Sequence, residues 1–584
     1  MKPASGLKKR LLWVGAGALA ILLLGLGLLL SPLYDPSPKM LAFVNAAVAR
    51  QQKIEAGIQA YYQAGNYTFS APLVLQDPYQ SAPLTALVIF DTPAPSQISI
   101  HVPGSTPQAA VDVTFPGYQQ HHEIPIYGLY AGTLNHVTIS TKTQAGQSSQ
   151  TGLDLQTEPL PVGMQSFTVD MLDRNKFSPG FNFASLDRKP VFDMDGNVRW
   201  YSSQKSFEVF TRLKNGRYLY TYSVGGVEGD LMMEQDLLGK IYAIYSVPGG
   251  VHHDVYELPN GNLLVTSSDL KSSTIEDYIL EIDRGNGHIV RSIDLKNILD
   301  PGRPGQVAGL PKDDWLHLNS IVYDPADHSI IISSKAQSAV VKLSYPGLQI
   351  KWILGPHDNW SPKFQPYLLT PVGANFEWPW SQHHATLYAP DVPGSASTDI
   401  LLFDNALYRS FTTASAVLPS EQFSRVVHYR VDAANMTIQQ VWDYGRERGP
   451  GLFSPTGGSV FSLSNGDVLG TWGDISTDTQ GNLSFSSDTN NAVSTKIIEV
   501  DPSSNALVFE VSVPQTAVYR TMRAGLYDGY SEGNAFLSTR LNNTAANDLV
   551  DRLHLAWQDV LRATISPLLA WLKKIHQLFL VMLK

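Results

Sequence analysis

The feature that most constrains this chain is a unit of short β-strands that repeats from about Asp187 onward. One half of the unit is a strand, a turn and a second strand, clearest in Phe192–Trp200. The other half is a hairpin around an Asn-Gly pair, clearest in Leu258–Val265, and Asn-Gly is a strong signal for a two-residue turn. We count six units at intervals of roughly 45 to 70 residues, and small sheets that cannot bury their own faces predict a circular array. The expectation is a six-bladed β-propeller, with seven blades as the alternative.

Other segments surround the predicted propeller of residues 161–540. Residues 67–160 show short alternating strands broken by Pro and Gly, among them Ala86–Phe90 and Gln97–Val102, which predicts a β-sandwich of immunoglobulin-like size. Residues 36–66 carry apolar side chains near helical spacing, which predicts a stalk helix or a helix packed on the body. Residues 541–584 predict amphipathic helices that could lie on a membrane, on the stalk helix or on the second subunit of a homodimer. The expected fold class is all-β, with helices at the two ends.

Residues 1–35 predict a membrane anchor. Lys8, Lys9 and Arg10 precede an unbroken apolar run from Leu11 to Leu30. A run of this length can span the hydrocarbon core of a bilayer, which is about 30 Å thick. Positive residues before the run predict that the N-terminus lies in the cytoplasm and the rest of the chain outside it. The run ends without a small-x-small cleavage pattern, which favours an uncleaved anchor over a signal peptide. We expect a single-pass protein of the inner membrane whose folded part lies on the periplasmic side.

Composition excludes several classes of partner and site. The chain has no cysteine, which removes disulfides, thiolate metal sites and cysteine nucleophiles. The formal net charge is -10 and no long basic run follows residue 10, so nucleic acid is not an expected partner. The His121-His122-Glu123 cluster lacks a third ligand at a suitable spacing, and a surface loop is the better interpretation.

The segment Asp314–Ser320 predicts one wall of a polar site. His317 and Asn319 lie two residues apart, so on a strand their side chains point to the same face. The same stretch runs on through Val and Ile residues to Lys335. Polar residues on one face at the start of such a strand are an unusual way to build a core.

Aligning the repeated units indicates which other residues share that level. An offset of 66 residues places His253 on Asn319. Another unit carries His383 and His384 at the matching strand start, and the register does not decide between them. Three units therefore present a histidine at one level, which predicts a functional cluster at the border of a central channel. Separate structural histidines, each held by a hydrogen bond, are the alternative.

The chemistry of this cluster has two main interpretations. Three histidines could bind zinc, as in a zinc-dependent hydrolase. In this alignment no Asp or Glu is aimed at the same point, and the nearby Lys335 disfavours a metal cation and favours an anion. His, Asn and Lys around a channel suit a small oxyanion such as sulfate or phosphate. They also suit a neutral imidazole nucleophile whose neighbours stabilise developing charge. We expect neither a metal nor a cofactor.

About residues 67 to 540 resemble the bacterial arylsulfate sulfotransferases that do not use the nucleotide sulfate donor. The resemblance is carried by His252-His253-Asp254, Asp314 to Ser320, Ser333-Ser334-Lys335, Trp352 to His357, Gln382-His383 and Phe403-Asp404-Asn405. The resemblance implies a six-bladed propeller with the active site in its central channel. It also implies ping-pong transfer of a sulfuryl group from a phenolic sulfate ester to a phenolic acceptor through a sulfohistidine.

The resemblance also implies roles for individual residues. Gln382-His383 is similar to the family's nucleophile motif, which favours His383 over His384. His253 and His317 would act as acid–base and oxyanion-binding groups, with Asn319 as a hydrogen-bond donor. The further candidates beside them are His252, His384 and Asn405.

Lys335 departs from the family pattern. It stands where the family motif usually reads Ser-Ser-Arg, and lysine cannot grip an oxyanion with two parallel bonds as arginine can. The lack of cysteines is a second departure, because some family members carry a disulfide. These departures leave an alternative interpretation open, in which the chain is a membrane-anchored propeller that binds a partner in its channel without catalysis.

Overall fold

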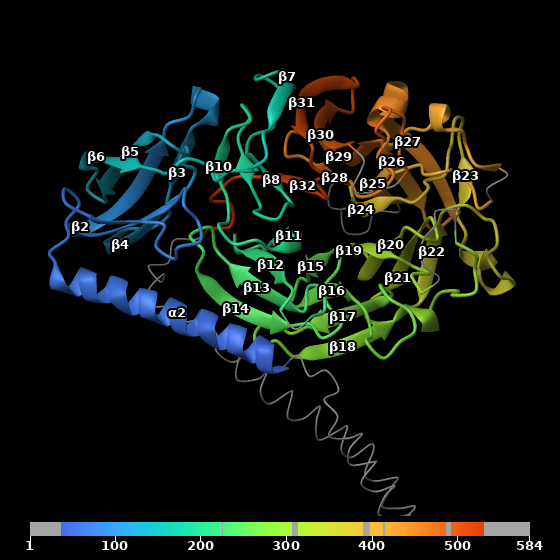
Figure 1. Cartoon of the computed structure of the whole chain (residues 1–584), viewed down its shortest axis with the longest axis horizontal. Helices are drawn as coiled ribbons and strands as arrows, with labels where there is room; N and C mark the ends of the chain where they lie inside the picture. Colours follow the sequence, from blue (N-terminus) through green and yellow to red (C-terminus); the bar gives the residue numbers. More distant parts are fainter. Residues whose placement is uncertain are drawn as a thin grey trace, which may run out of the picture.

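A computed structural model describes residues 37–530, except 225, 306–312, 389–396, 413–414 and 486–491. The predicted anchor of residues 1–35 and the predicted C-terminal helices of residues 541–584 lie outside the described residues. Among the described helices, none combines the length and the apolar character that crossing a membrane requires. The described chain consists mainly of β-strands (Figure 1).

One long strand organises the first domain. The strands are β1 Leu73–Gln76, β2 Ala86–Val102, β3 Val111–Thr114, β4 Gln119–Ile126, β5 Leu134–Thr143 and β6 Ser148–Gln156. β2 pairs with β1, β3, β4 and β5, so all six strands belong to one sheet. The sequence predicted two separate strands, Ala86–Phe90 and Gln97–Val102. Pro93 and Pro95 lie between them, where the register of β2 against β4 shifts, so they do not interrupt regular pairing.

Three sheets of four strands follow in the chain. The first comprises β8 Phe181–Ala184, β9 Val191–Phe192, β10 Val198–Trp200 and β32 Thr521–Ala524. The second comprises β11 Phe207–Arg212, β12 Tyr218–Tyr222, β13 Leu231–Gln235 and β14 Ile241–Ser246. The third comprises β15 Val255–Glu257, β16 Leu263–Ser267, β17 Tyr278–Ile282 and β18 Ile289–Asp294.

Three more sheets complete the described body. One comprises β19 Leu318–Asp324, β20 Ser329–Ser334, β21 Ala339–Ser344 and β22 Ile350–Leu354. The next has β23 Thr370–Val372, β24 His383–Leu387, β25 Ser397–Asp404, β26 Arg425–Asp432 and β27 Thr437–Tyr444. The last has β28 Ser459–Ser462, β29 Val468–Thr477, β30 Ala492–Asp501, β31 Ala506–Pro514 and β7 Thr168–Leu172. Short 3-10 helices occupy Pro107–Ala109, Leu295–Asn297, Pro362–Tyr367, Pro419–Glu421 and Arg446–Leu452.

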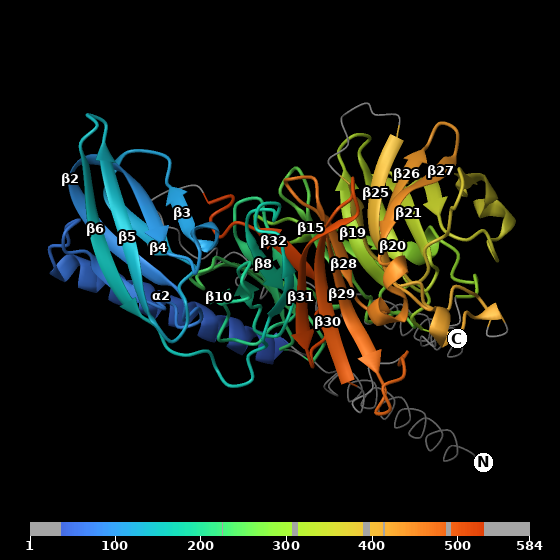
Figure 2. The ribbon, with the colours of Figure 1, turned by 90° about the horizontal axis from the view of Figure 1, so that it is seen from above.

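Strands from the two ends of the described body lie side by side. β32 pairs with β8, and β31 pairs with β7, so a late strand completes the first of these sheets and an early strand completes the last. In Figures 1 and 2 the colours run from teal through green, yellow and orange, and the red strand β32 returns beside the teal strand β8. This long-range pairing ties the end of the repeat to its beginning.

The cores lie between successive sheets. Leu219 and Met232 of the β11–β14 sheet share one buried cluster with Leu263 and Val265 of the next sheet. Val340 of the β19–β22 sheet packs in the same way with a cluster on the sheet that follows it. Each sheet therefore buries its faces against its neighbours, as the repeat predicted for units that have no core of their own.

The Asn-Gly hairpins differ from the turn that the sequence predicted. At Leu258–Asn262 the amide of Leu258 donates to the Asn262 carbonyl, which leaves a loop of three residues. Gly261 has a φ of +89°, whereas Asn260 is not among the residues with positive φ. A two-residue turn of the predicted type requires positive φ at both positions, and one left-handed glycine after a type I turn is typical of a three-residue loop. The hairpin prediction holds and its turn type is corrected.

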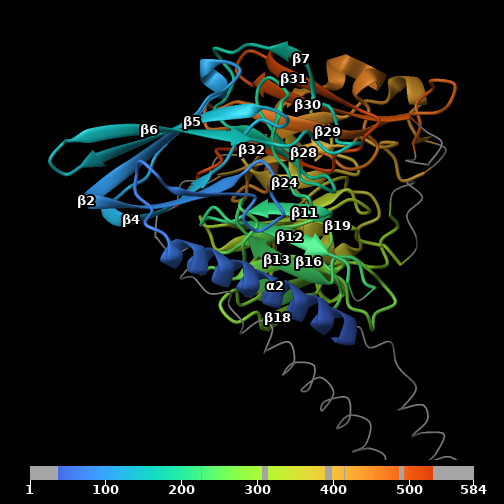
Figure 3. The same ribbon diagram turned by 60° about the vertical axis from the view of Figure 1, so that its left-hand side comes forward.

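Helix α2, Ser37–Ala64, packs along the body instead of standing apart from it (Figure 3). The ring of Phe43 lies 6.1 Å from that of Tyr222 in β12. Farther along, Tyr62 donates to Asp91 of β2 at 2.6 Å. The helix therefore contacts both the β11–β14 sheet and the first domain, which fits the packed alternative of the sequence analysis.

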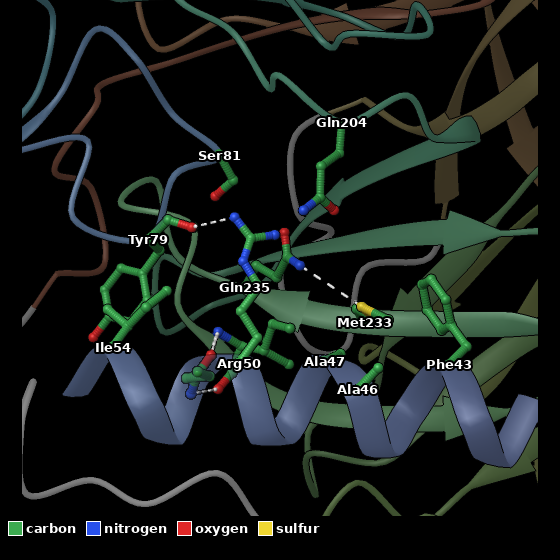
Figure 4. A pocket seen from close by; sticks show the side chains of 13 residues that line it. Phe43, Ala46, Ala47, Arg50, Ile54, Tyr79, Ser81, Gln204, Met233 and Gln235 are labelled. Atoms are coloured by element: carbon green, nitrogen blue, oxygen red, sulfur yellow. Dashed lines mark hydrogen bonds between the residues drawn. The ribbon is translucent and has the colours of Figure 1, made fainter. Parts of the chain in front are cut away.

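A pocket of about 280 Å³ lies between α2, the segment around Tyr79 and the β11–β14 sheet (Figure 4). Arg50 reaches across it to the carbonyl of Tyr79 at 3.4 Å. Gln51 is buried and binds the backbone of Ile241 twice, because its amide nitrogen donates to the carbonyl and its oxygen accepts from the N–H, both at 2.8 Å. The side chain of Gln51 thus extends the edge of β14 by one pair of hydrogen bonds.

Replacing Gln51 with Ala is expected to loosen α2. The change leaves two partly buried backbone groups of Ile241 unsatisfied, and each costs about 1–3 kcal/mol. Amide exchange in α2 should therefore accelerate by at least about tenfold, as mass spectrometry would measure. Gln52→Ala, at an exposed neighbouring position, is the matched control. Equal exchange in the two variants would contradict this account of Gln51.

Candidate active site

A cavity of about 450 Å³ collects residues from the edges of all six repeated sheets. We call it the histidine cavity. Its walls are formed by Ser185, Leu186, Asp187, Ser206, His253, His317, Lys335, His383, Thr456, Gly457, Gly473, Asp474, Ala517, Val518 and Tyr519. Most of these residues lie just before or after a strand, where side chains are not committed to the cores between sheets.

Three histidines meet in this cavity. The ring centroid of His317 lies 4.8 Å from that of His253 and 6.4 Å from that of His383. The ring of Tyr519 lies 5.5 Å from that of His253 and 6.2 Å from that of His383. Lys335 lines the same cavity. The structure therefore brings together four of the residues that the sequence analysis selected.

His253 and His317 reach the cavity from strained backbone and not from regular strands. Their φ angles are +63° and +48°, and the strands that follow begin at Val255 and Leu318. Left-handed backbone is uncommon for residues other than glycine and is often found at functional sites. The pairing of β19 with β20 also shifts register between Leu318 and Ser320. The prediction that His317 and Asn319 point to one face of a regular strand is therefore wrong, because a bulge breaks the alternation.

Asn319 supports the cavity from behind. It is fully buried and is not among the residues that line the cavity. Its amide nitrogen donates to the carbonyl of Gln382 at 2.8 Å. Because Gln382 immediately precedes His383, this bond holds the backbone from which His383 projects.

Two of the further candidates point elsewhere. The Nδ1 atom of His384 lies 2.8 Å from the carbonyl of Val460, and its ring packs 4.5 Å from Phe461. His384 lines a different cavity, described below. The ring of His252 lies 5.2 Å from that of His253, but His252 does not line the histidine cavity.

Asn405 determines which ring nitrogen of His383 carries the proton. The amide nitrogen of Asn405 donates to the carbonyls of Ser454 and Gly457, both at 2.8 Å, so its oxygen is the free acceptor. That oxygen lies 2.7 Å from Nδ1 of His383, which must therefore carry the hydrogen. The Nε2 atom of a neutral His383 is then left with its lone pair, as a nucleophile requires.

Burial keeps His383 neutral. Its side chain is almost fully buried, and desolvation moves the pKa of the imidazole well below its usual value, with Lys335 and His317 lowering it further. Burial also lowers the pKa of Lys335, while the carboxylates of Asp314 and Glu276 act in the opposite direction. The cavity thus combines a neutral imidazole with a buried amine that has acidic neighbours.

Two carboxylates that the sequence analysis did not place here contact the histidines. Glu276 accepts from Nε2 of His253 at 3.0 Å and lies 3.1 Å from Nδ1 of His317. Asp314 accepts from the same Nδ1 atom at 2.6 Å. The expectation that no acidic side chain is aimed at the cluster is therefore wrong. The hydrogen bond with His253 and the charges of His253 and His317 keep the pKa of Glu276 far below its usual value despite its burial.

These acidic groups also bring potential metal ligands together. Ligand atoms of His252, His253 and Glu276 lie within 4.8 Å of one another, as do those of Glu276, Asp314 and His317. The carboxylates already bind the imidazole nitrogens, and Lys335 lines the same cavity. An anion therefore suits the cavity better than a metal cation does.

The sequence held different signals for the two carboxylates. Asp314 stands inside the segment that drew attention to His317, and its i,i+3 spacing from that histidine was visible. Glu276 lies in the connection between β16 and β17 with a φ of +54°, outside any repeated motif. Nothing in its local sequence distinguishes it from a surface residue.

Comparison with known proteins identifies the family. The sequence profile described as Arylsulfotransferase (ASST) matches residues 141–520, and the profile of the Arylsulfotransferase Ig-like domain matches residues 73–158. The chain belongs to the arylsulfotransferase family. It is therefore a sulfotransferase enzyme whose family moves sulfuryl groups between aryl compounds. The resemblance noted from the sequence is confirmed.

Two relatives share most of their length with this arylsulfotransferase. It is 28% identical to the arylsulfate sulfotransferase AssT of Escherichia coli O6:H1 over 65% of this chain and 81% of that protein. It is 26% identical to the arylsulfate sulfotransferase AssT of Lelliottia amnigena over 72% of this chain and 88% of that protein. Among solved structures, the periplasmic gluconolactonase PpgL of Pseudomonas aeruginosa covers 74% of this chain and 99% of its own at 11% identity. The TM-score of this match is 0.30.

Proposed function

We propose that this arylsulfotransferase works by a ping-pong mechanism in which His383 carries the sulfuryl group. The observation that carries the proposal is the hydrogen bond from Nδ1 of His383 to Asn405, which directs the lone pair of Nε2 away from that contact. A phenolic sulfate ester is the donor and a phenol is the acceptor, in keeping with the names of the two relatives. We also propose that the six sheets are the blades of a β-propeller whose channel contains the histidine cavity.

In the first half-reaction, Nε2 of His383 attacks the sulfur of the donor in line with the leaving phenolic oxygen. The new N–S bond forms as the S–O bond breaks, and the phenoxide leaves with the electron pair. Lys335 offsets the charge of the sulfuryl oxygens, and the Asp314–His317 pair, next to His253, supplies the proton that the phenoxide takes up. In the second half-reaction the acceptor phenol gives its proton back to that pair, its oxygen bonds to sulfur, and the N–S bond breaks.

The direct test is to incubate the enzyme with 4-nitrophenyl sulfate in the absence of an acceptor. About one equivalent of nitrophenol per chain should appear in a burst, together with an acid-labile sulfuryl group on a histidine peptide. Adding a phenol should then give steady turnover. A rate that requires both substrates from the first turnover, with no labelled peptide, would exclude the ping-pong mechanism. If sulfated phenol still forms, the result would also exclude a propeller that binds a partner in its channel without catalysis.

Glu276 is expected to keep His253 and His317 in their working protonation states, because its carboxylate is hydrogen-bonded to His253 and lies 3.1 Å from Nδ1 of His317. Glu276→Gln removes the charge and retains the size, so kcat/KM should fall by about 100-fold, the lower end of general acid–base effects. Asp269→Asn, in the same connection, changes a carboxylate that binds the backbone of Lys271 and should stay within about twofold. Comparable losses in both variants would point to a general disturbance of the loop.

Asp314 should give the reaction a pH limb. Burial raises the pKa of Asp314 to about 7, with the nearby charge of Glu276 adding to the shift. The Asp314–His317 pair therefore holds its extra proton below that pH and loses it above. With phenyl sulfate, whose leaving group is a strong base, the rate of the first half-reaction should fall as the pH rises through about 7. With 4-nitrophenyl sulfate the fall should be smaller, and Asp314→Asn should remove it. A limb that persists in Asp314→Asn belongs to another group.

For the location, we propose that the apolar run Leu11–Leu30 anchors the enzyme in the inner membrane with the folded body on the periplasmic side. The support is the length of the run and the basic residues before it. N-terminal sequencing of the membrane-extracted protein tests the proposal. A mature N-terminus near residue 35 would show that the apolar run is a cleaved signal peptide and not an anchor.

A further inference from the structure

A second cavity, of about 200 Å³, lies next to the histidine cavity and is also lined by all six repeated sheets. We call it the arginine cavity. Its walls include polar and apolar side chains from the strands β8, β11, β15, β19, β24, β28 and β32. Ser185 lines both cavities.

Consecutive residues divide between the two cavities. Tyr519 lines the histidine cavity and Arg520 lines the arginine cavity. His253 and His383 face the histidine cavity, and the residues that follow them, Asp254 and His384, face the arginine cavity. The two spaces are therefore neighbours along the same set of strands, separated by a layer one residue thick.

Arg520 presents an unused edge in this second space. Its Nη1 atom donates to Asp254 at 2.7 Å. Its Nε and Nη2 atoms are buried and make no well-aligned hydrogen bond with a described residue, although the hydroxyl of Tyr519 is close enough to interact with the guanidinium group. Nε and Nη2 form one edge of the guanidinium group, with parallel N–H bonds that match two oxygens of a carboxylate or sulfate. A buried donor without a partner is costly, so an unused pair of this kind indicates a ligand.

The rest of the cavity suits an anion joined to an apolar group. Asp254 cannot turn to cover the free edge, because its Oδ2 atom accepts from the amide of Ile321 at 2.9 Å. Burial keeps the pKa of His384 well below its usual value, so this imidazole is neutral and does not compete with Arg520 for the anion. The apolar walls are supplied by Phe183, Phe210, Val255, Ile321, Phe461 and Met522.

We propose that the arginine cavity binds a small oxyanion carried on a single aromatic ring, with its oxygens on Nε and Nη2 of Arg520. This site is distinct from the one where the sulfuryl group is transferred. Tyr519 connects the two, because its ring lies 5.6 Å from the guanidinium carbon of Arg520 and 6.2 Å from the ring of His383. An occupant bound to Arg520 is therefore linked to the nucleophile indirectly, through the contact of Arg520 with Tyr519 and of Tyr519 with His383.

Calorimetric titration with benzoate tests the proposal, because benzoate has the required oxygens and ring and no sulfuryl group to transfer. One benzoate should bind per chain. Arg520→Lys keeps the ion pair with Asp254 and removes the fork, so affinity should fall by at least tenfold. Arg212→Gln is the matched control, because Arg212 lines the same cavity but its guanidinium is held by Asp528, and affinity should change by less than about twofold.

Two further arms separate this site from the histidine cavity. Lys335→Gln should leave benzoate affinity unchanged, and inorganic sulfate should bind at least tenfold more weakly than benzoate because it lacks the ring. If Arg520→Lys does not fold, the double variant Asp254→Asn with Arg520→Gln removes both charges together and should also lose binding. The proposal is overturned if wild-type enzyme shows no saturable binding, if Lys335→Gln rather than Arg520→Lys abolishes it, or if sulfate and benzoate bind equally. None of these results depends on whether His383 forms a covalent intermediate.

Discussion

Replacing His383 with Ala is expected to reduce sulfuryl transfer from 4-nitrophenyl sulfate by at least about a thousandfold, because the variant lacks the atom that carries the group between substrates. The burst of nitrophenol and the labelled histidine peptide should both disappear. The measurement is stopped-flow absorbance for the burst and mass spectrometry for the peptide. Donor binding should persist, because Lys335, His253 and His317 remain in the cavity.

His384 provides the matched control. It is a histidine adjacent to His383 in the chain. It lines the arginine cavity, and its Nδ1 atom lies 2.8 Å from the carbonyl of Val460. His384→Ala should therefore keep the burst and the label, with changes in rate of no more than a few fold. If the label survives in His383→Ala and is lost in His384→Ala, the nucleophile is His384 and the resemblance at Gln382-His383 is misleading.

Asn405 allows a finer test of the same idea. In Asn405→Asp the acceptor for Nδ1 of His383 gains a negative charge, whereas in Asn405→Leu it is lost. If the amide acts by fixing the tautomer, the Leu variant should lose the burst amplitude or its rate although His383 is present. The nucleophile then depends on a hydrogen bond made 22 residues away in sequence.

The repeated units were visible in the sequence because they depend on local patterns. Turn residues at Asn260-Gly261 and alternating strands on either side predicted the hairpin, and the structure has it. The pairing of β32 with β8 joins residues more than three hundred positions apart and leaves no local trace. The continuous strand β2 was missed for a related reason, since Pro93 and Pro95 suggest a break unless the partner strands are known.

The site was predictable only in part, again for physical reasons. Histidines at matching places in the repeat pointed to His253, His317 and His383, which the structure brings together. The positive φ of His253 and His317 was not predictable, because left-handed backbone is uncommon even for histidine and the surrounding fold imposes it here. Glu276 was missed because its contacts come entirely from residues distant in sequence.

Lys335→Ala is expected to have the second largest effect. Lys335 supplies the buried positive charge beside the three histidines, and the sulfuryl oxygens carry more charge density as the N–S bond forms. Removing a stabilising group of this kind costs about 2.7–4 kcal/mol, or roughly 10²- to 10³-fold in kcat. The loss should be seen in the burst rate as well as in steady turnover, because the same charged sulfuryl group is transferred in both half-reactions.

Lys335→Arg separates charge from geometry. The guanidinium restores the residue that the family motif usually has and can bind two sulfuryl oxygens at once, so activity should be retained or raised. Lys335→Gln keeps a polar side chain without charge and should behave like Lys335→Ala. If Lys335→Arg is as inactive as Lys335→Ala while both fold normally, the smaller ammonium group has a specific task here. Proton exchange with Asp314 and Glu276 would then be the first candidate, because their charges oppose the burial-driven lowering of the Lys335 pKa more strongly than that of Asp474 does.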